Sequence, residues 1–259
     1  MLLMFFGCLD VSLFQIFVHL KDYRKILLVL FVIHLSGPIV VFLMKPFFSS
    51  EIYLGLILAT VISSGMSVVF LSQLYGGIPS KALVITSLSN ILSPLSVPFL
   101  VFLFAGTAIA VDFFAMALTV VKLVIVPVIA ALLVKKIRLY GVLRDYGTYI
   151  SIVVLFFLIL GIISPVRAII LADIGQSLVL FGLACVFVVI NFSLGYFAGS
   201  SREEKITYAI SGSYKNFTLS TVIALSLFSP VVAMPSVIYS VVNNLSLIAI
   251  QFVFGEKKD

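Results

Sequence analysis

Long apolar runs separated by short polar stretches extend along the whole chain. Each run has about 20 residues, the length that crosses roughly 30 Å of hydrocarbon as an α-helix. We predict nine such segments, at residues 2–20, 25–46, 51–74, 80–104, 111–134, 146–164, 176–199, 203–228 and 230–254. The longest connection, residues 164–176, is expected to hold a short interfacial helix. The pattern therefore predicts an all-α polytopic membrane protein.

The amino-acid composition supports this prediction. Of the 259 residues, 63% are hydrophobic and 10% are charged, whereas a soluble domain has about 25% charged residues. We expect an integral protein of the cell (inner) membrane, with the lipid bilayer as one partner. Cys8 and Cys185 lie in separate apolar segments without metal-ligand spacing, so neither a metal site nor another cofactor is expected.

Positive charges are concentrated in alternate loops and at the C-terminus. These regions hold 12 of the 16 Lys and Arg residues: Lys21, Arg24, Lys25, Lys81, Lys135, Lys136, Arg138, Arg144, Arg202, Lys205, Lys257 and Lys258. Because cytoplasmic loops collect Lys and Arg, we expect the N-terminus outside and the C-terminus in the cytoplasm. The net charge of +6 then reflects contact with anionic lipid headgroups, and no nucleic-acid partner is expected.

Two of the predicted segments have irregular centres. VISSGMS (61–67) and ISGSYKN (210–216) each place a Ser/Gly cluster halfway along an apolar run. Helix breaks at membrane depth are tolerated only where protein or a water-filled cavity satisfies the freed backbone groups. Two interrupted segments in corresponding halves point to the binding site of a secondary transporter built from inverted repeats. The alternative is that these small residues only allow close helix packing.

Two stretches resemble the bile acid:sodium symporters and their bacterial homologues. They are LYGGIPSKALVITSLSNILSPLSVPFLVFLFAG (74–106) and KNFTLSTVIALSLFSPVVAMPSVIYSVVNNLS (215–246). The first is similar to the fifth helix of that family, and the second to its ninth-helix crossover and last helix. The resemblance implies ten helices in two inverted repeats, divided between a core and a panel domain. In that fold the fourth and ninth helices are unwound and cross, and transport proceeds by alternating access.

The resemblance also implies that the family's first helix is missing from this chain. Residues 1–24 then form a truncated panel helix, 25–106 the core helices of the first repeat, 107–170 panel helices, and 171–259 the core helices of the second repeat. We expect either a natural nine-helix form or a fragment with a misassigned start. A homodimer that forms through the incomplete panel is a further alternative.

The family binds sodium with an acidic residue and a glutamine at the ninth-helix crossover, a serine–asparagine pair at the fourth helix, and hydroxyls on the fifth. At the crossover positions this chain has Ser211, Lys215 and the following Asn216; at the others it has Val68, Val69, Thr86 and Ala82. Sodium prefers oxygen ligands. Valine offers none and an ammonium repels the ion, so sodium is not expected at the Lys215 position.

We therefore predict that Lys215 replaces a bound sodium ion. Its ammonium has three N–H donors for the freed carbonyls of the crossing, so transport is expected to be sodium-independent. A permanently charged ammonium makes the protein a facilitator or exchanger, whereas an ammonium that loses and regains its proton couples transport to protons. The residues selected for the ion site or coupling are Lys215, Ser211, Ser213, Thr86 and His34.

A small organic anion of bile-acid or carboxylate type is the expected substrate. It would bind beside the crossing, where half-helix N-termini present the positive ends of their dipoles. The residues selected for it are Asn216, Asn244, Asn243, Met66 and Ser67. By the resemblance, Asn216 and Asn244 match substrate-cavity positions, whereas Met66 replaces a small polar residue.

Several alternatives stay open. Lys215 is weighed against a lysine that snorkels to the interface, and His34 against a packed, hydrogen-bonded histidine. Sodium symport with relocated ligands, and a non-transporting sensor, leak or degenerate subunit, are the alternative functions. An enzyme is not expected, because the ionisable residues within the segments form no metal-ligand or nucleophile–base pattern; they are Asp10, His34, Lys122 and Lys215.

Overall fold

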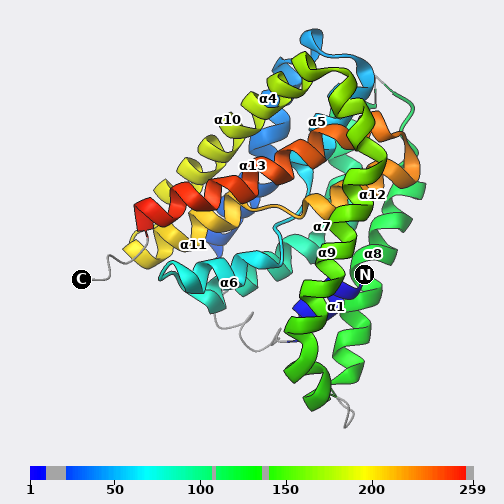
Figure 1. The fold of residues 1–259 in the computed structure, drawn as a ribbon. Coiled ribbons are helices and arrows are strands. Elements are labelled where there is room, and N and C mark those ends of the chain that lie inside the picture. Colours follow the sequence, from blue (N-terminus) through cyan, green and yellow to red (C-terminus); the bar gives the residue numbers. More distant parts are fainter. Residues whose placement is uncertain (10–21, 107–108, 136–139, 255–259) are drawn as a thin grey trace.

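The structure is a computed structural model that describes residues 1–9, 22–106, 109–135 and 140–254 (Figure 1). These residues form helices and one isolated β-bridge, which confirms the predicted all-α class. The helices are α1 (Leu2–Cys8), α3 (Tyr23–Phe31), η2 (Val32–Ser36), α4 (Gly37–Leu43), η3 (Lys45–Phe47), α5 (Ser50–Val61), α6 (Ser67–Leu74), α7 (Pro79–Ala105), α8 (Phe113–Val134), α9 (Tyr140–Ala172), α10 (Ile174–Ala198), α11 (Arg202–Ser213), α12 (Phe217–Leu227) and α13 (Pro230–Phe254).

Most predicted segments coincide with helices. Within the described part of the chain, five helical stretches are long and apolar enough to cross a membrane: Tyr23–Leu43, Pro79–Ala105, Phe113–Val134, Ile174–Ala198 and Pro230–Phe252. They match the segments predicted to begin at residues 25, 80, 111, 176 and 230. The first predicted segment is helical over α1, and residues 10–20, with Asp10, lie outside the described residues.

The prediction for residues 146–176 was wrong in its boundaries. Instead of one span and a separate interfacial helix, α9 continues from Tyr140 through Pro165 to Ala172. Asp173 then ends the helix and begins the next one, because its side chain accepts a hydrogen bond from the amide of Gln176 at 2.8 Å. An N-cap of this kind satisfies one of the free amides at the start of α10.

Both predicted interruptions are confirmed. One apolar run is divided into α5 and α6, which end at Val61 and begin at Ser67. The other is divided into α11 and α12, which end at Ser213 and begin at Phe217. Ile62 leaves the helix with an extended backbone (ψ 151°). The freed backbone groups therefore lie in the interior of the protein.

Glycine allows α10 to approach the first half of the second broken helix. A Cβ atom on Gly195 would lie 2.3 Å from the carbonyl oxygen of Tyr208 in α11, and one on Gly199 would lie 2.4 Å from the amide nitrogen of Lys205. No larger residue fits at such distances. The sequence GYFAG (195–199) thus has the small-xxx-small spacing that brings membrane helices into backbone contact.

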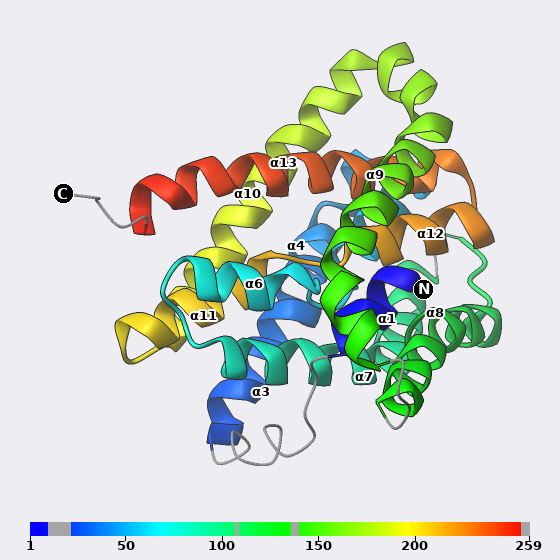
Figure 2. The same ribbon diagram turned by 60° about the horizontal axis from the view of Figure 1, so that its bottom comes forward.

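The helices gather into two groups in both ribbon views (Figures 1 and 2). Helices α1, α8 and α9 lie together on one side, and α1 contacts both of the others. The broken helices pack among α7, α10 and α13 on the other side. The groups meet where α13 and α12 contact α9, and where α12 and α7 contact α8. Assigning these groups to a panel and a core stays a prediction.

Candidate functional site

The two interrupted segments pair with each other through their backbones. An antiparallel bridge joins Ser64 and Lys215. The amide of Gly65 donates to the carbonyl of Tyr214 at 2.9 Å, and the amide of Asn216 donates to the carbonyl of Ser63 at 2.8 Å. A Cβ atom on Gly65 would lie 3.1 Å from the carbonyl oxygen of Lys215, so the crossing chains approach closely.

Lys215 points into the interior of this crossing. Its side chain is 5% exposed, and its ammonium donates hydrogen bonds to the carbonyls of Ile33 and Thr60. Thr60 lies in the last turn of α5, where helix carbonyls lack intrahelical partners and carry partial negative charge. The alternative of a snorkelling lysine is therefore wrong.

The other carbonyl acceptor comes from an irregular turn. Ile33 belongs to η2, a π-helix inserted between α3 and α4. Such π-bulges frequently occur at functional sites. His34 follows in the same turn, with Nδ1 2.8 Å from the carbonyl of Val61 and Nε2 3.0 Å from the hydroxyl of Ser89. The predicted ion-site residues Lys215 and His34 therefore meet at the same end of α5.

Helix α7 supplies polar side chains that sequence reasoning missed. Asn90 accepts a hydrogen bond from the Ser63 hydroxyl at 2.9 Å and donates to the carbonyls of Thr86 and Ser64 at 2.8 and 3.3 Å. The hydroxyl of Ser89 accepts from the amide of Ser64 at 3.1 Å. A signal existed in the sequence: Thr86, Ser89 and Asn90 have the i, i+3, i+4 spacing of one helix face.

The remaining predicted ion-site residues surround Ser64. The hydroxyl of Ser64 lies 3.5 Å from that of Thr86 and donates to the carbonyl of Ser211 at 3.3 Å. The Ser211 hydroxyl is buried and has no protein partner among the described residues. Ser213 is different, because its hydroxyl donates to the carbonyl of Ala209 within its own helix at 2.7 Å.

Val68 and Val69 stand where the resemblance implies the sodium ligands of the fourth helix, but they do not form the crossing. Val68 is buried in an apolar cluster with Ile210 and Tyr214, and Val69 packs against this cluster. The hydroxyls at the crossing come from Ser63 and Ser64, earlier in the chain. Oxygen-bearing side chains are therefore present on this side of the crossing, at positions that were not selected from the sequence.

The five residues selected for a substrate have different environments. Asn216 is half-buried, and its side-chain oxygen caps α12 by accepting from the amide of Leu219 at 3.1 Å. Met66 is half-buried, with its sulfur 3.8 Å from the amide nitrogen of Asn90. Ser67 is exposed at the start of α6.

Asn243 and Asn244 lie on α13. The side-chain oxygen of Asn243 is buried without a protein partner among the described residues, whereas Asn244 is exposed and donates to the carbonyl of Ser240 at 2.8 Å. The Tyr214 hydroxyl lies 2.8 Å from that of Ser246 and so links the crossing to this part of α13. No hydrogen bond joins any two of the five selected residues in the described part of the chain; their convergence on one ligand stays a prediction.

A second polar cluster lies at the N-terminal ends of α3, α7 and α11. The ammonium of Lys81, at the start of α7, donates to Asp22 at 2.8 Å and to Glu204 at 2.7 Å. Lys25 also donates to Glu204, at 2.7 Å. The hydrogen bond and the positive charge of Lys81 hold the pKa of the Asp22 carboxyl below its ordinary value. This cluster ties together the first turns of α3, α7 and α11.

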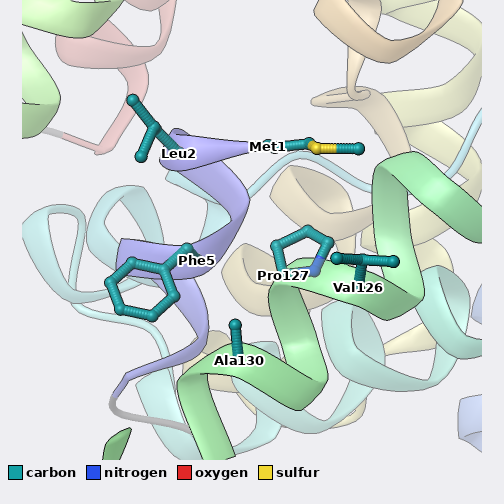
Figure 3. Close-up of a pocket in the computed structure, with 6 residues that line it drawn as sticks. All are labelled: Met1, Leu2, Phe5, Val126, Pro127 and Ala130. Carbon is teal, nitrogen blue, oxygen red and sulfur yellow. The ribbon is translucent and has the colours of Figure 1, made fainter.

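The pocket in Figure 3 is apolar. It has a volume of about 180 Å³ and lies between α1 and α8, lined by Met1, Leu2, Phe5, Val126, Pro127 and Ala130. None of these side chains carries a charge or a hydrogen-bonding group. An anion would lose its hydration there without gaining a partner, so the crossing is the better candidate site.

Comparison with known proteins identifies the family. A family model described as the sodium bile acid symporter family matches residues 1–174. The chain belongs to this family. Members of the sodium bile acid symporter family are transporters rather than enzymes, which agrees with the expected class. The predicted family is thereby confirmed; the match includes the stretch 74–106, whereas 215–246 lies outside it.

Two relatives from Bacillus subtilis (strain 168) are similar to this chain. One is named an uncharacterized sodium-dependent transporter, YocS, with 29% identity over 206 residues, or 76% of this chain. The other is named an uncharacterized protein, YbaS, with 24% identity over 191 residues, or 71% of this chain. The matched region spans 62% of the length of each relative.

Proposed function

We propose that the protein is a secondary transporter of small organic anions that works by alternating access and does not require sodium. The observation that supports this proposal is the position of the Lys215 ammonium, which donates to the carbonyls of Ile33 and Thr60. In the described part of the chain, no carboxylate forms an ion pair with Lys215. The ammonium is thus held by neutral carbonyl oxygens, which are also ligands that sodium accepts.

The electrostatics of α5 explain why a cation belongs there. The last carbonyls of a helix carry about half a negative elementary charge, and a nearby cation stabilises them. Thr60 belongs to this helix end. Lys215 supplies one positive charge and N–H donors without a diffusing ion, so the crossing keeps its structure when sodium is absent.

The substrate is proposed to bind beside the opposite ends of the half-helices. Helix α12 begins at Phe217, next to Asn216 and two residues after Lys215. Its N-terminus carries partial positive charge, which favours a carboxylate or similar anion. The half-buried Asn216 and the unpartnered oxygen of Asn243 would provide polar contacts. We also propose that the protein lies in the cell membrane with its C-terminus in the cytoplasm.

The coupling depends on whether Lys215 keeps its proton. A lysine that stays charged gives facilitated transport or exchange. A lysine that loses its proton in one state of the cycle gives proton-coupled transport. Uptake measured with and without a proton gradient distinguishes the two.

The test is uptake of a panel of organic anions into proteoliposomes, with sodium or with potassium outside. We expect equal uptake in both salts for the unchanged protein and loss of sodium-free uptake in Lys215→Ala. Lys215→Gln is expected to regain uptake only when sodium is present. The matched control is Lys122→Ala, which removes an exposed membrane lysine on α8. Uptake that requires sodium in the unchanged protein contradicts the proposal.

Sodium symport with relocated ligands is the second candidate, because oxygen atoms gather around Ser64. The hydroxyl of Thr86 lies nearby, and the buried hydroxyl of Ser211 has no hydrogen-bond partner within the described ranges of the chain. Hydroxyl and carbonyl oxygens are ligands that hard cations accept. Sodium-dependent uptake that is lost in Ser64→Ala and kept in Lys215→Gln would support this candidate. A protein that moves no anion in either salt is instead a sensor, a leak or an inactive subunit.

A further inference from the structure

We infer that His34 is a positioning residue, which works with Ser89 to hold the extended segment of the first broken helix in place for its pairing with the second. His34 lies in η2 and Ser89 in α7, on opposite sides of this segment along the sequence. The expected effect of His34 on uptake rests on the proposed transport function. The hydrogen bonds that hold the segment do not involve the Lys215 side chain.

Two hydrogen bonds that a continuous helix would make here are replaced by bonds to other parts of the protein. An unbroken helix over residues 50–74 would join the amide of Ser64 to the carbonyl of Thr60, and the amide of Gly65 to the carbonyl of Val61. In the structure Thr60 accepts from Lys215 and Gly65 donates to Tyr214. These two groups are satisfied by the second broken helix.

The other two groups are satisfied by His34 and Ser89. The carbonyl of Val61 lies 2.8 Å from His34 Nδ1, and the amide of Ser64 donates to Ser89 Oγ at 3.1 Å. The histidine and serine side chains are themselves joined, with 3.0 Å between His34 Nε2 and Ser89 Oγ. His34 and Ser89 therefore connect the two sides of the break.

The direction of this chain follows from the chemistry of its members. A carbonyl oxygen only accepts, so His34 Nδ1 carries a proton. The Ser89 oxygen already accepts from the Ser64 amide, so its own proton is available for His34 Nε2, which accepts in the neutral ring. A proton on Nε2 as well would leave the Ser89 proton without this acceptor and would place a second cation close to Lys215. We therefore infer a neutral His34 with its proton on Nδ1.

This arrangement has a functional consequence because it fixes the extended segment that contains Ser63 and Gly65. These residues make the backbone hydrogen bonds to Asn216 and Tyr214. If the segment shifts, the carbonyl of Thr60 moves relative to the Lys215 ammonium, and Asn216 moves relative to the proposed anion. The hydrogen-bond partners of His34 are the Val61 carbonyl and the Ser89 hydroxyl, so it acts on Lys215 and Asn216 through the backbone.

The first test is nitrogen NMR of the protein carrying isotope-labelled histidine. The sequence has two histidines, so a His19→Gln variant leaves His34 as the single signal. We expect a neutral ring protonated on Nδ1. Ser89→Ala should shift the Nε2 resonance and leave the Nδ1 proton in place, whereas Ser96→Ala should change neither. Ser96 is a suitable control because it lies on the same helix and its hydroxyl has no protein partner in the described residues.

The second test is sodium-free anion uptake by the same variants. Ser89→Ala and His34→Ala each remove two buried hydrogen bonds, and one such bond corresponds to about a tenfold change. Each substitution should therefore lower uptake at least about tenfold, with Ser96→Ala unchanged. A ring protonated on Nε2 or on both nitrogens overturns the inference, and so does uptake by Ser89→Ala equal to that of Ser96→Ala. If the unchanged protein transports no anion, the proposed function fails, whereas the NMR result still decides the position of the proton.

Discussion

Lys81 and Lys215 are equally buried, each 5% exposed, yet they have opposite kinds of partner. Lys81 donates to two carboxylates, Asp22 and Glu204. Lys215 donates to two backbone carbonyls. The first lysine is part of a cluster whose charges cancel, whereas the second has no carboxylate partner among the residues that the structure describes.

From this difference we expect Lys81 to have a structural role and Lys215 to take the place of a bound ion. A buried ion pair is costly to break because the remaining charge keeps its desolvation penalty. A cation bound only by carbonyls leaves neutral groups behind when it is removed, and these groups can bind another cation. We therefore expect Lys81 to be irreplaceable and Lys215 to be replaceable by sodium.

The largest effect is expected from removing the shared carboxylate of the ion-pair cluster. Glu204→Ala leaves Lys25 without its carboxylate and Lys81 with Asp22 alone, which should lower the free energy of unfolding by about 3–5 kcal/mol. Thermal unfolding in detergent measures the loss, and added sodium should not reverse it. Glu203→Ala, which alters the adjacent exposed carboxylate, is the control. Equal unfolding temperatures for the two variants would show that the cluster does not stabilise the fold.

An intermediate effect is expected at the crossing. Lys215→Ala leaves the carbonyls of Ile33 and Thr60 without this donor, which should cost about 2–4 kcal/mol at about 1–2 kcal/mol for each buried neutral group. In contrast to Glu204→Ala, sodium should raise the unfolding temperature of this variant in a concentration-dependent manner. Potassium at the same ionic strength is the control. If neither salt acts differently, the carbonyls do not form a cation site.

The smallest effect is expected at Asp22, whose side chain is 49% exposed. Surface ion pairs contribute about 1 kcal/mol or less, so Asp22→Asn should destabilise the protein by no more than this. Its pKa is lowered from 3.8 in the folded protein, so its contribution is complete above that value and disappears as the pH falls through the folded pKa. Unfolding curves of both proteins from neutral to acidic pH should therefore converge. A difference that grows on acidification would contradict this assignment.

Much of the fold was predictable because the bilayer constrains the sequence so strongly. Segments of about 20 apolar residues and the Ser/Gly clusters at 61–67 and 210–216 were visible without any contact information. The boundary of α9 was not predictable, because a proline in a membrane helix need not end it. Pro165 lies inside α9, which ends at Ala172 instead.

The candidate site was predictable only in part. Lys215 stood out because an unpaired lysine in an apolar run is rare. The role of Ser89 depends on contact with His34, 55 residues away in the sequence. The acceptor carbonyl of Ile33 belongs to the π-helix η2, and apolar periodicity in the sequence does not reveal a π-helix. Likewise, the pairing of Lys81 with Glu204 joins residues 123 positions apart.

The hydrogen bond between Lys215 and Thr60 also has a consequence for biogenesis. It joins residues 155 positions apart, and synthesis proceeds at about 5–20 residues per second, so the ribosome needs on the order of ten to thirty seconds to make the second partner after the first. During this interval the first broken helix lacks the acceptor carbonyl of Tyr214 and the donors of Lys215 and Asn216. The nascent chain must therefore keep this segment outside the lipid core, or shelter it with an insertion factor, until the last third of the protein arrives.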